Sequence, residues 1–243
     1  MEQLIVLFSL IFSVILGGVI VTYLHASNKQ KFIKLMLSFS GGFLLSIAFI
    51  HFVPDLYSSS TKNIGVYILV GFLVQLILEF FSGGIEHGHV HVHKGQKMPW
   101  GLFISLSFHS LLEGIPLGSQ YNAHIGHHHH HAHDGNSLLL GILFHQLPVA
   151  VALMTLLMNT KLTKTKAWFV LIAFALMTPL GLLVGSFTEG AINFDFNIVL
   201  AVVVGMFLHI STTIIFETNE NHKFNVMKLT SILIGCSLAF LMN

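Results

Sequence analysis

Two ionisable residues stand four positions apart in an apolar stretch of the chain. His109 and Glu113 lie in the run FHSLLEG, and Glu113 is the only acidic residue well inside a hydrophobic span. On a helix, this spacing puts an imidazole and a carboxylate on one face. A bare carboxylate in hydrocarbon is costly, so such residues usually face a bundle interior, find a partner and mark an ion or substrate path. We therefore predict that Glu113 meets a metal ion.

A third candidate ligand, His145, lies in the run FHQLP. His109 and His145 each stand eight residues from the outer end of their predicted spans, 100–117 and 137–158, or about 12 Å deep at ~1.5 Å per residue. Neighbouring antiparallel helices would bring them to one depth. Two imidazoles and one carboxylate suit Zn²⁺ or a similar divalent ion, with water or a further side chain completing the shell. The alternative is a polar contact that only holds two helices together.

Two further histidines extend this hypothesis. His51 stands near the predicted outer end of its helix, three residues before Pro54. It is a candidate fourth ligand or entrance ligand; the alternative is an interfacial histidine. His209 lies deeper and toward the cytoplasm in the span 196–216, where it would receive a released ion or a proton, unless it is a core histidine with ordinary hydrogen bonds.

Two loops are rich in histidine, and they lie on opposite sides of the predicted membrane. We predict loops at 82–99, on the cytoplasmic side, and 118–136, on the extracytoplasmic side. Their histidines are His87, His89, His91 and His93 in the first loop and His124, His127, His128, His129, His130, His131 and His133 in the second. Such tracts chelate transition metals loosely. The first would accept ions inside and the second would capture them outside; the alternative for either tract is a disordered polar linker.

The composition defines the elements that must position these residues. The chain has 243 residues, of which 54% are hydrophobic and 9% charged, and its mean hydropathy is +0.80, which excludes a soluble domain. We predict an all-α membrane protein, one domain over 1–243, with eight transmembrane helices. The predicted spans are 4–24, 35–53, 64–81, 100–117, 137–158, 167–187, 196–216 and 227–242. The net charge of +1 gives no reason to expect a nucleic acid partner.

The distribution of lysines predicts the orientation in the membrane. Ten of the 11 basic residues fall in or beside the loops that follow spans 1, 3, 5 and 7, and only Lys62 falls on the other side. The positive-inside rule therefore makes these loops cytoplasmic and both termini extracytoplasmic. No organelle address is evident, so we expect the plasma membrane.

Helices 1–3 and 6–8 would enter the membrane from opposite sides. The run GFLLSI in helix 2 also resembles GMFLHI in helix 7. These observations predict a pseudo-inverted repeat, which would leave helices 4 and 5 as the central pair around the metal site.

At helix 4, the residues resemble a known family. His109-Ser110-Leu111-Leu112-Glu113-Gly114 is similar to the His-Asn/Ser-x-x-Glu-Gly signature of the ZIP (Zrt/Irt-like) metal transporters, and His145-Gln146-Leu147-Pro148 resembles their helix 5 motif, His-Glu-x-Pro-His-Glu. The resemblance extends to the number of spans and the histidine-rich third loop. It implies eight helices with an inverted repeat, movement of Zn²⁺ or related ions toward the cytoplasm, and a homodimer.

The chain also departs from this pattern. Members with two metals carry an acidic residue where Gln146 stands and a histidine or glutamate where Val149 stands, and Ala150 replaces the final glutamate. By resemblance, the first metal position is kept and the second has lost most of its charge. We therefore predict one transported ion, with Ser110 and Gln146 either offering neutral oxygens to it or packing between helices.

Two functions are compatible with these residues. The first is transport of Zn²⁺, or of Fe²⁺, Mn²⁺, Co²⁺, Ni²⁺ or Cd²⁺, into the cytoplasm by alternating access, with the ion as substrate and no cofactor. The second is an intramembrane zinc hydrolase of lipid amides or esters, in which Glu113 is the general base. No His-Glu-x-x-His motif is present, and histidine tracts on both faces have no evident use in hydrolysis. We therefore expect a transporter and not an enzyme.

Overall fold

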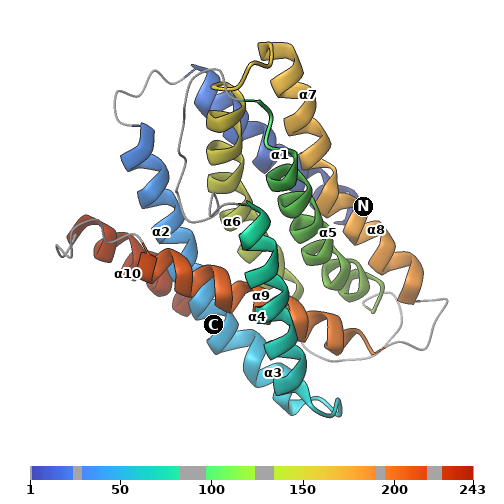
Figure 1. The fold of residues 1–243 in the computed structure, drawn as a ribbon. Coiled ribbons are helices and arrows are strands. Elements are labelled where there is room, and N and C mark those ends of the chain that lie inside the picture. The colour runs from blue at the N-terminus through green and yellow to red at the C-terminus, as the bar shows by residue number, and fades with distance from the viewer. Residues whose placement is uncertain are drawn as a thin grey trace.

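The computed structural model describes residues 2–23, 29–82, 97–123, 134–189, 195–217 and 226–242, and its regular elements are helices (Figure 1). In chain order they are α1 (Glu2–Tyr23), α2 (Lys29–Ile47), the π-helix η1 (Ala48–Phe52), α3 (Val53–Ser58), α4 (Ile64–Ser82), α5 (Trp100–Ala123), α6 (Asp134–Leu157), α7 (Lys164–Ala175), α8 (Met177–Glu189), α9 (Phe196–Glu217) and α10 (Val226–Leu241). Because α2, η1 and α3 are continuous and α7 leads directly into α8, the described chain makes eight helical passes.

Seven of these passes are long and apolar enough to cross a membrane, and α10, with 16 residues, is shorter. Large apolar side chains cover much of the outer surface; on α4, Leu69, Ile77 and Phe80 are all exposed. Lipid tails solvate such a surface, whereas water does not. The predicted all-α membrane class is therefore confirmed for the described residues.

The predicted helix ends need correction around the second histidine-rich loop. Helix α5 continues to Ala123 and α6 begins at Asp134, so residues 118–123 and 134–136 are helical and only 124–133 separate the two helices. Hydropathy marks where a chain crosses hydrocarbon, and a helix can continue beyond that point with polar residues. The predicted loop 118–136 was therefore too long.

Prolines explain two irregular places in the helices. Proline lacks an N–H and its ring crowds the carbonyl four residues earlier. Pro54 follows the π-helical turn of η1, where Val53 N–H donates to Ala48 O. The carbonyl that the Pro54 ring would crowd, four residues earlier, lies within this wider turn. Helix α7 likewise ends at Ala175, four residues before Pro179.

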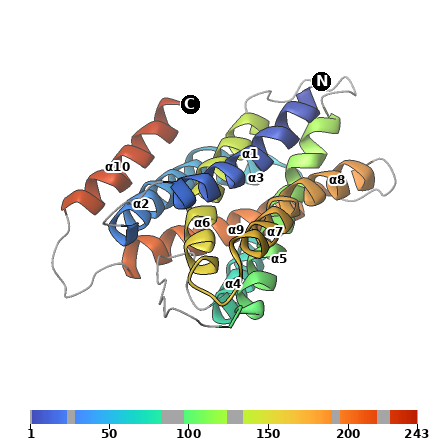
Figure 2. The ribbon, with the colours of Figure 1, turned by 90° about the horizontal axis from the view of Figure 1, so that it is seen from above.

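The helices divide into two groups by their packing. Helices α1, α5, α6, α7 and α8 form what we call the site group; within it α5 packs most extensively on α8, and α1 on α6. The elements α2, η1, α3, α4, α9 and α10 form the frame group, in which α2 packs on α10 and α4 on α9. Figures 1 and 2 show α8 and α10 at opposite edges of the molecule. The groups meet mainly where α2 contacts α6 and where α4 contacts α5.

Glycines allow the closest helix pairs to form. On α5 and α8, a Cβ at Gly114 would lie 3.0 Å from Gly181 Cα and 2.8 Å from Leu182 N, so the backbones touch where no side chain intervenes. Similar close approaches occur at Gly71 and Gly205 between α4 and α9. Small residues permit this van der Waals packing, which is a principal attraction between helices in lipid.

Candidate metal centre

Three buried side chains from two neighbouring helices converge in the site group. His109 and Glu113 come from α5 and His145 from α6, and each is at most 2% exposed. One ligand atom from each residue lies within 4.8 Å of the others. The structure therefore brings together the three residues that the spacing and depth predicted.

Helix geometry produces this arrangement. Because His109 and Glu113 are one turn apart, their side chains lie on the same face, and His109 Nε2 is 2.6 Å from Glu113 Oε1. The His145 ring stands nearly perpendicular to the His109 ring, at 79° and 5.7 Å between centroids. Pro148 lies inside α6 and lacks an N–H, so the carbonyl of Phe144, next to His145, loses its usual helical donor.

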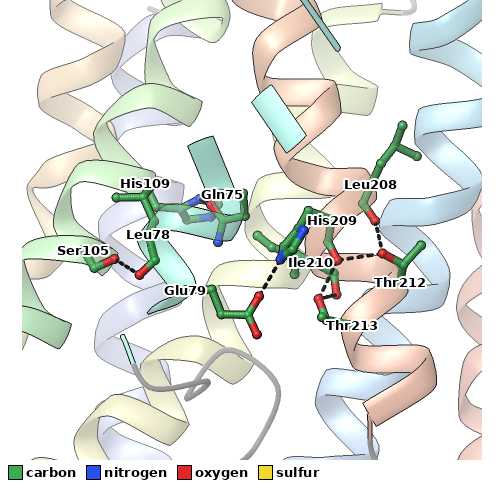
Figure 3. A network of polar contacts seen from close by, with 10 residues as sticks. All are labelled: Gln75, Leu78, Glu79, Ser105, His109, Leu208, His209, Ile210, Thr212 and Thr213. Carbon is green, nitrogen blue, oxygen red and sulfur yellow. Dashed lines mark hydrogen bonds and ion pairs between the residues drawn. The ribbon is translucent and has the colours of Figure 1, made fainter. Parts of the chain in front are cut away.

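Polar side chains of the frame group contact the outer nitrogen of each histidine. Gln75 on α4 is fully buried, and its Oε1 lies 2.9 Å from His109 Nδ1 (Figure 3). Ser40 Oγ on α2 lies 3.4 Å from His145 Nδ1. An amide oxygen only accepts hydrogen bonds, so Nδ1 of His109 carries the proton, and in the neutral imidazole Nε2 is then the lone pair that faces the cluster. This is the usual arrangement around a metal-binding histidine.

The carboxylate supplies the least satisfied group of the cluster. Glu113 is completely buried, and neither of its carboxylate oxygens has a hydrogen-bond partner among the described residues. A buried carboxylate without full hydrogen bonding is costly unless a cation compensates it. Two imidazole nitrogens with one carboxylate form a donor set that suits Zn²⁺ and neighbouring divalent transition metals.

Comparison with known proteins agrees with this chemistry. The family model of the ZIP zinc transporters matches residues 82–243, which include all three residues of the cluster and about two thirds of the chain. The chain belongs to the ZIP zinc transporter family. A search of curated proteins found no match.

ZIP membership implies a membrane protein that transports zinc or a related divalent metal, with the ion as its substrate, and it points to a transporter rather than an enzyme. The resemblance expected from the two helix motifs is thereby confirmed. Residues 1–81, which contain Ser40, His51 and Gln75, lie outside the matched segment.

The other candidate residues are distributed around the three-residue cluster. His51 is buried in η1 on the frame group and does not belong to the cluster. Ser110 is buried on α5, and Gln146 is buried on α6, where its Nε2 donates to Thr178 Oγ1 of α8. The Gln146 Oε1 has no hydrogen-bond partner among the described residues. The roles of these residues in metal movement stay predictions.

His209 contacts a carboxylate that the sequence analysis missed. Its Nε2 contacts Glu79 Oε2, from α4, and the two side chains are 5% and 17% exposed (Figure 3). Phe72 lies edge-on to the His209 ring. Glu79 stands near the end of its apolar span, where an acidic residue is easily interpreted as interfacial. Glu79 stands four residues after Gln75, and this spacing puts both polar side chains on one face of α4. That spacing could have indicated that Glu79 points into the helix bundle.

The histidine tracts fall in the remaining parts of the chain. All 11 predicted capture histidines, at 87–93 and 124–133, lie outside the described residues. Their role in ion capture therefore stays a prediction from the sequence.

Proposed function

We propose that this ZIP protein imports a divalent transition-metal ion, with Zn²⁺ as the first candidate, through one intramembrane site formed by His109, Glu113 and His145. The observation that carries the proposal is the buried cluster itself, in which neither oxygen of Glu113 has a hydrogen-bond partner among the described residues. An ion would compensate this charge, and two histidines are placed to share its coordination. Fe²⁺, Mn²⁺, Co²⁺, Ni²⁺ and Cd²⁺ have overlapping ligand preferences and are the alternative substrates.

The proposed orientation follows from the lysines. Ten of them lie on one side of the predicted topology, which puts the loop 82–99 in the cytoplasm and both termini outside. The plasma membrane is proposed as the location because no organelle address is evident in the sequence. Ions would then gather at the tract 124–133, enter past His51 and leave past His209. Ser110 and Gln146 would offer neutral oxygens on the way.

Alternating access would come from movement of the site group against the frame group. The packing is compatible with a pseudo-inverted repeat. In such a repeat α1, α2 and α4 correspond to α8, α9 and α10, and α5 corresponds to α6. The pair α1·α6 then corresponds to α8·α5, and the pair α2·α10 to α9·α4, and all four pairs are in contact. A homodimer is the assembly that the family resemblance suggests.

The hydrolase alternative is not favoured. It needs a metal-bound water, a general base and a lipid-accessible pocket. In the described structure Glu113 contacts a candidate ligand, His109, at 2.6 Å and is completely buried, which suits ion coordination better than attack on a lipid.

Zn²⁺ uptake by purified protein tests the proposal. Proteoliposomes loaded with a fluorescent chelator should take up Zn²⁺ with the intact protein, and the variant His145→Ala should lose nearly all uptake because one of three ligands is gone. Thr155→Ala is the matched control on the same helix, since its hydroxyl bonds to Val151 O at 2.7 Å, one turn earlier on α6. Uptake by His145→Ala at the intact rate would overturn the proposed site. Absence of transport for every metal tried, with hydrolysis of a lipid panel, would favour the enzyme.

Deletion of 124–133 gives a separate prediction. The tract contains seven histidines that chelate loosely, so its loss should reduce uptake at low external Zn²⁺ but leave the maximal rate nearly unchanged. Uptake measured across a range of Zn²⁺ concentrations distinguishes these effects. A fall in the maximal rate as large as that of His145→Ala would contradict an auxiliary capture role.

A further inference from the structure

The two hydrogen bonds that orient the histidine ligands cross the boundary between the helix groups. His109 and His145 belong to the site group, whereas their partners Gln75 and Ser40 belong to the frame group. Both partners are completely buried. A third crossing bond, from Ser105 Oγ to Leu78 O at 2.5 Å, does not touch the cluster.

The backbone contacts indicate where relative movement is easiest. An added Cβ would approach backbone atoms within about 3 Å at Gly114 and Gly181 inside the site group, and at Gly71 and Gly205 inside the frame group. At the boundary, a Cβ on Gly141 would lie 3.6 Å from Leu44 Cδ2, which is ordinary side-chain contact. Helix pairs within each group are therefore interlocked through their backbones, while the boundary at this point is formed by side chains.

Ring contacts at the boundary follow the same pattern. Phe144 of the site group packs edge-on against Phe39 and Phe43 of the frame group, with centroids 5.6 and 4.9 Å apart. Such apolar contacts are non-directional and tolerate a shift, whereas a hydrogen bond weakens steeply as its distance and angle change. A relative shift of the groups would therefore affect the bonds to His109 and His145 before it affects the packing.

The hydrogen bonds to Nδ1 of His109 and His145 affect how these rings bind a metal ion. While Nδ1 donates to an outer partner, Nε2 is fixed as the lone pair that faces the ion. When the partner moves away, the ring can rotate or exchange tautomers, and ligand orientation is lost. Loss of such an outer partner typically weakens metal affinity by about 10–100-fold.

We propose that Gln75 and Ser40 are positioning residues that couple metal affinity to the arrangement of the two helix groups. In the arrangement described here, both hydrogen bonds orient the ligands and the site binds tightly. Movement of the site group separates both histidines from their partners, so affinity falls as the groups shift and the ion is released. This inference rests on the proposed transport function, but its test measures binding and structure rather than transport.

Equilibrium binding tests the positioning role. Gln75→Met keeps the side-chain length and removes the acceptor, so Zn²⁺ affinity in lipid nanodiscs should fall about 10–100-fold. Gln75→Glu restores an acceptor and should recover the affinity. Ser211→Ala is the control in the frame group, because its hydroxyl bonds to Phe207 O at 2.6 Å, one turn earlier on α9. Unchanged affinity in Gln75→Met, or no recovery in Gln75→Glu, would overturn the positioning role.

Distance measurement tests the coupling. Spin labels on cysteines at Phe187 of α8 and Leu241 of α10, both more than three quarters exposed, report the separation of the groups once Cys236 is replaced by alanine. If the arrangement of the groups affects Zn²⁺ affinity, Zn²⁺ binding must favour that arrangement to the same extent. Zn²⁺ should therefore narrow the distribution of label–label distances in the intact protein. At saturating Zn²⁺, the double variant Ser40→Ala, Gln75→Met should show much less narrowing. Equal narrowing in both proteins would overturn the coupling. A protein that binds Zn²⁺ with these properties but transports none would refute the proposed function alone.

Discussion

Replacement of Glu113 by alanine is expected to reduce Zn²⁺ uptake by more than about 100-fold, beyond the ~10–100-fold loss typical of removing a residue that only orients a ligand. Glu113 supplies the negative charge of the cluster, and without it two neutral imidazoles must hold a divalent ion in a low-dielectric environment. Glu113→Gln should fail equally, because it keeps the shape and removes the charge. Chelator fluorescence in proteoliposomes measures both.

Folding should survive these changes. Removal of a buried carboxylate eliminates a desolvation cost, and alanine is a good helix former. Thermal unfolding in detergent should therefore be similar for both variants and the intact protein. Ser119→Ala is the matched control on α5, since its hydroxyl bonds to Pro116 O at 2.9 Å. Substantial uptake by Glu113→Gln would mean that the ion does not require this charge, and the site would have to be sought elsewhere.

The second large effect is expected from Gly181→Leu. A Cβ at this position would lie 3.0 Å from Leu111 C and 3.1 Å from Gly114 Cα, so a leucine forces α5 and α8 apart. Overpacking commonly costs about 1–3 kcal/mol, and the upper end or more is expected here because rigid backbone is in the way. Thermal unfolding in detergent should show the loss of stability. Since α5 carries His109 and Glu113, Zn²⁺ binding should be lost as well.

Gly101→Ala separates this effect from a general intolerance of α5 to substitution. A Cβ there would meet Phe81 O at 3.6 Å, an ordinary contact, so stability and uptake should both persist. If Gly181→Leu unfolds at the same temperature as the intact protein, the close approach of α5 and α8 does not contribute to stability as inferred.

The three-residue cluster was predictable because it depends on local rules. The four-residue spacing of His109 and Glu113 follows from helix geometry alone, and the depth of His145 follows from counting residues along an apolar span. Hydropathy likewise located the helical passes, since an uninterrupted apolar run of that length has few other uses. Helix ends were less accurate, as the polar continuation of α5 to Ala123 shows.

The residues around the cluster were not predictable in the same way. Gln75 and Ser40 reach the histidines only because α4 packs on α5 and α2 packs on α6 with particular rotations. Hydropathy does not specify which face of one helix meets another. The π-helical turn at His51 is also invisible to an apolar count, although Pro54 indicates some irregularity nearby.

The amide at Gln146 has an electrical consequence. Glu113 is the one carboxylate of the described cluster, so with ionised Glu113 and neutral imidazoles a bound divalent ion leaves a net charge of about +1, and the emptied site carries about −1. Membrane voltage acts on each such charge with about 2.3 kcal/mol per 100 mV across the full bilayer. In the proposed import cycle, an inside-negative potential would pull the loaded site inward and push the emptied site outward, the two directions that this cycle requires. A second carboxylate at 146 would neutralise the loaded site and remove the inward pull.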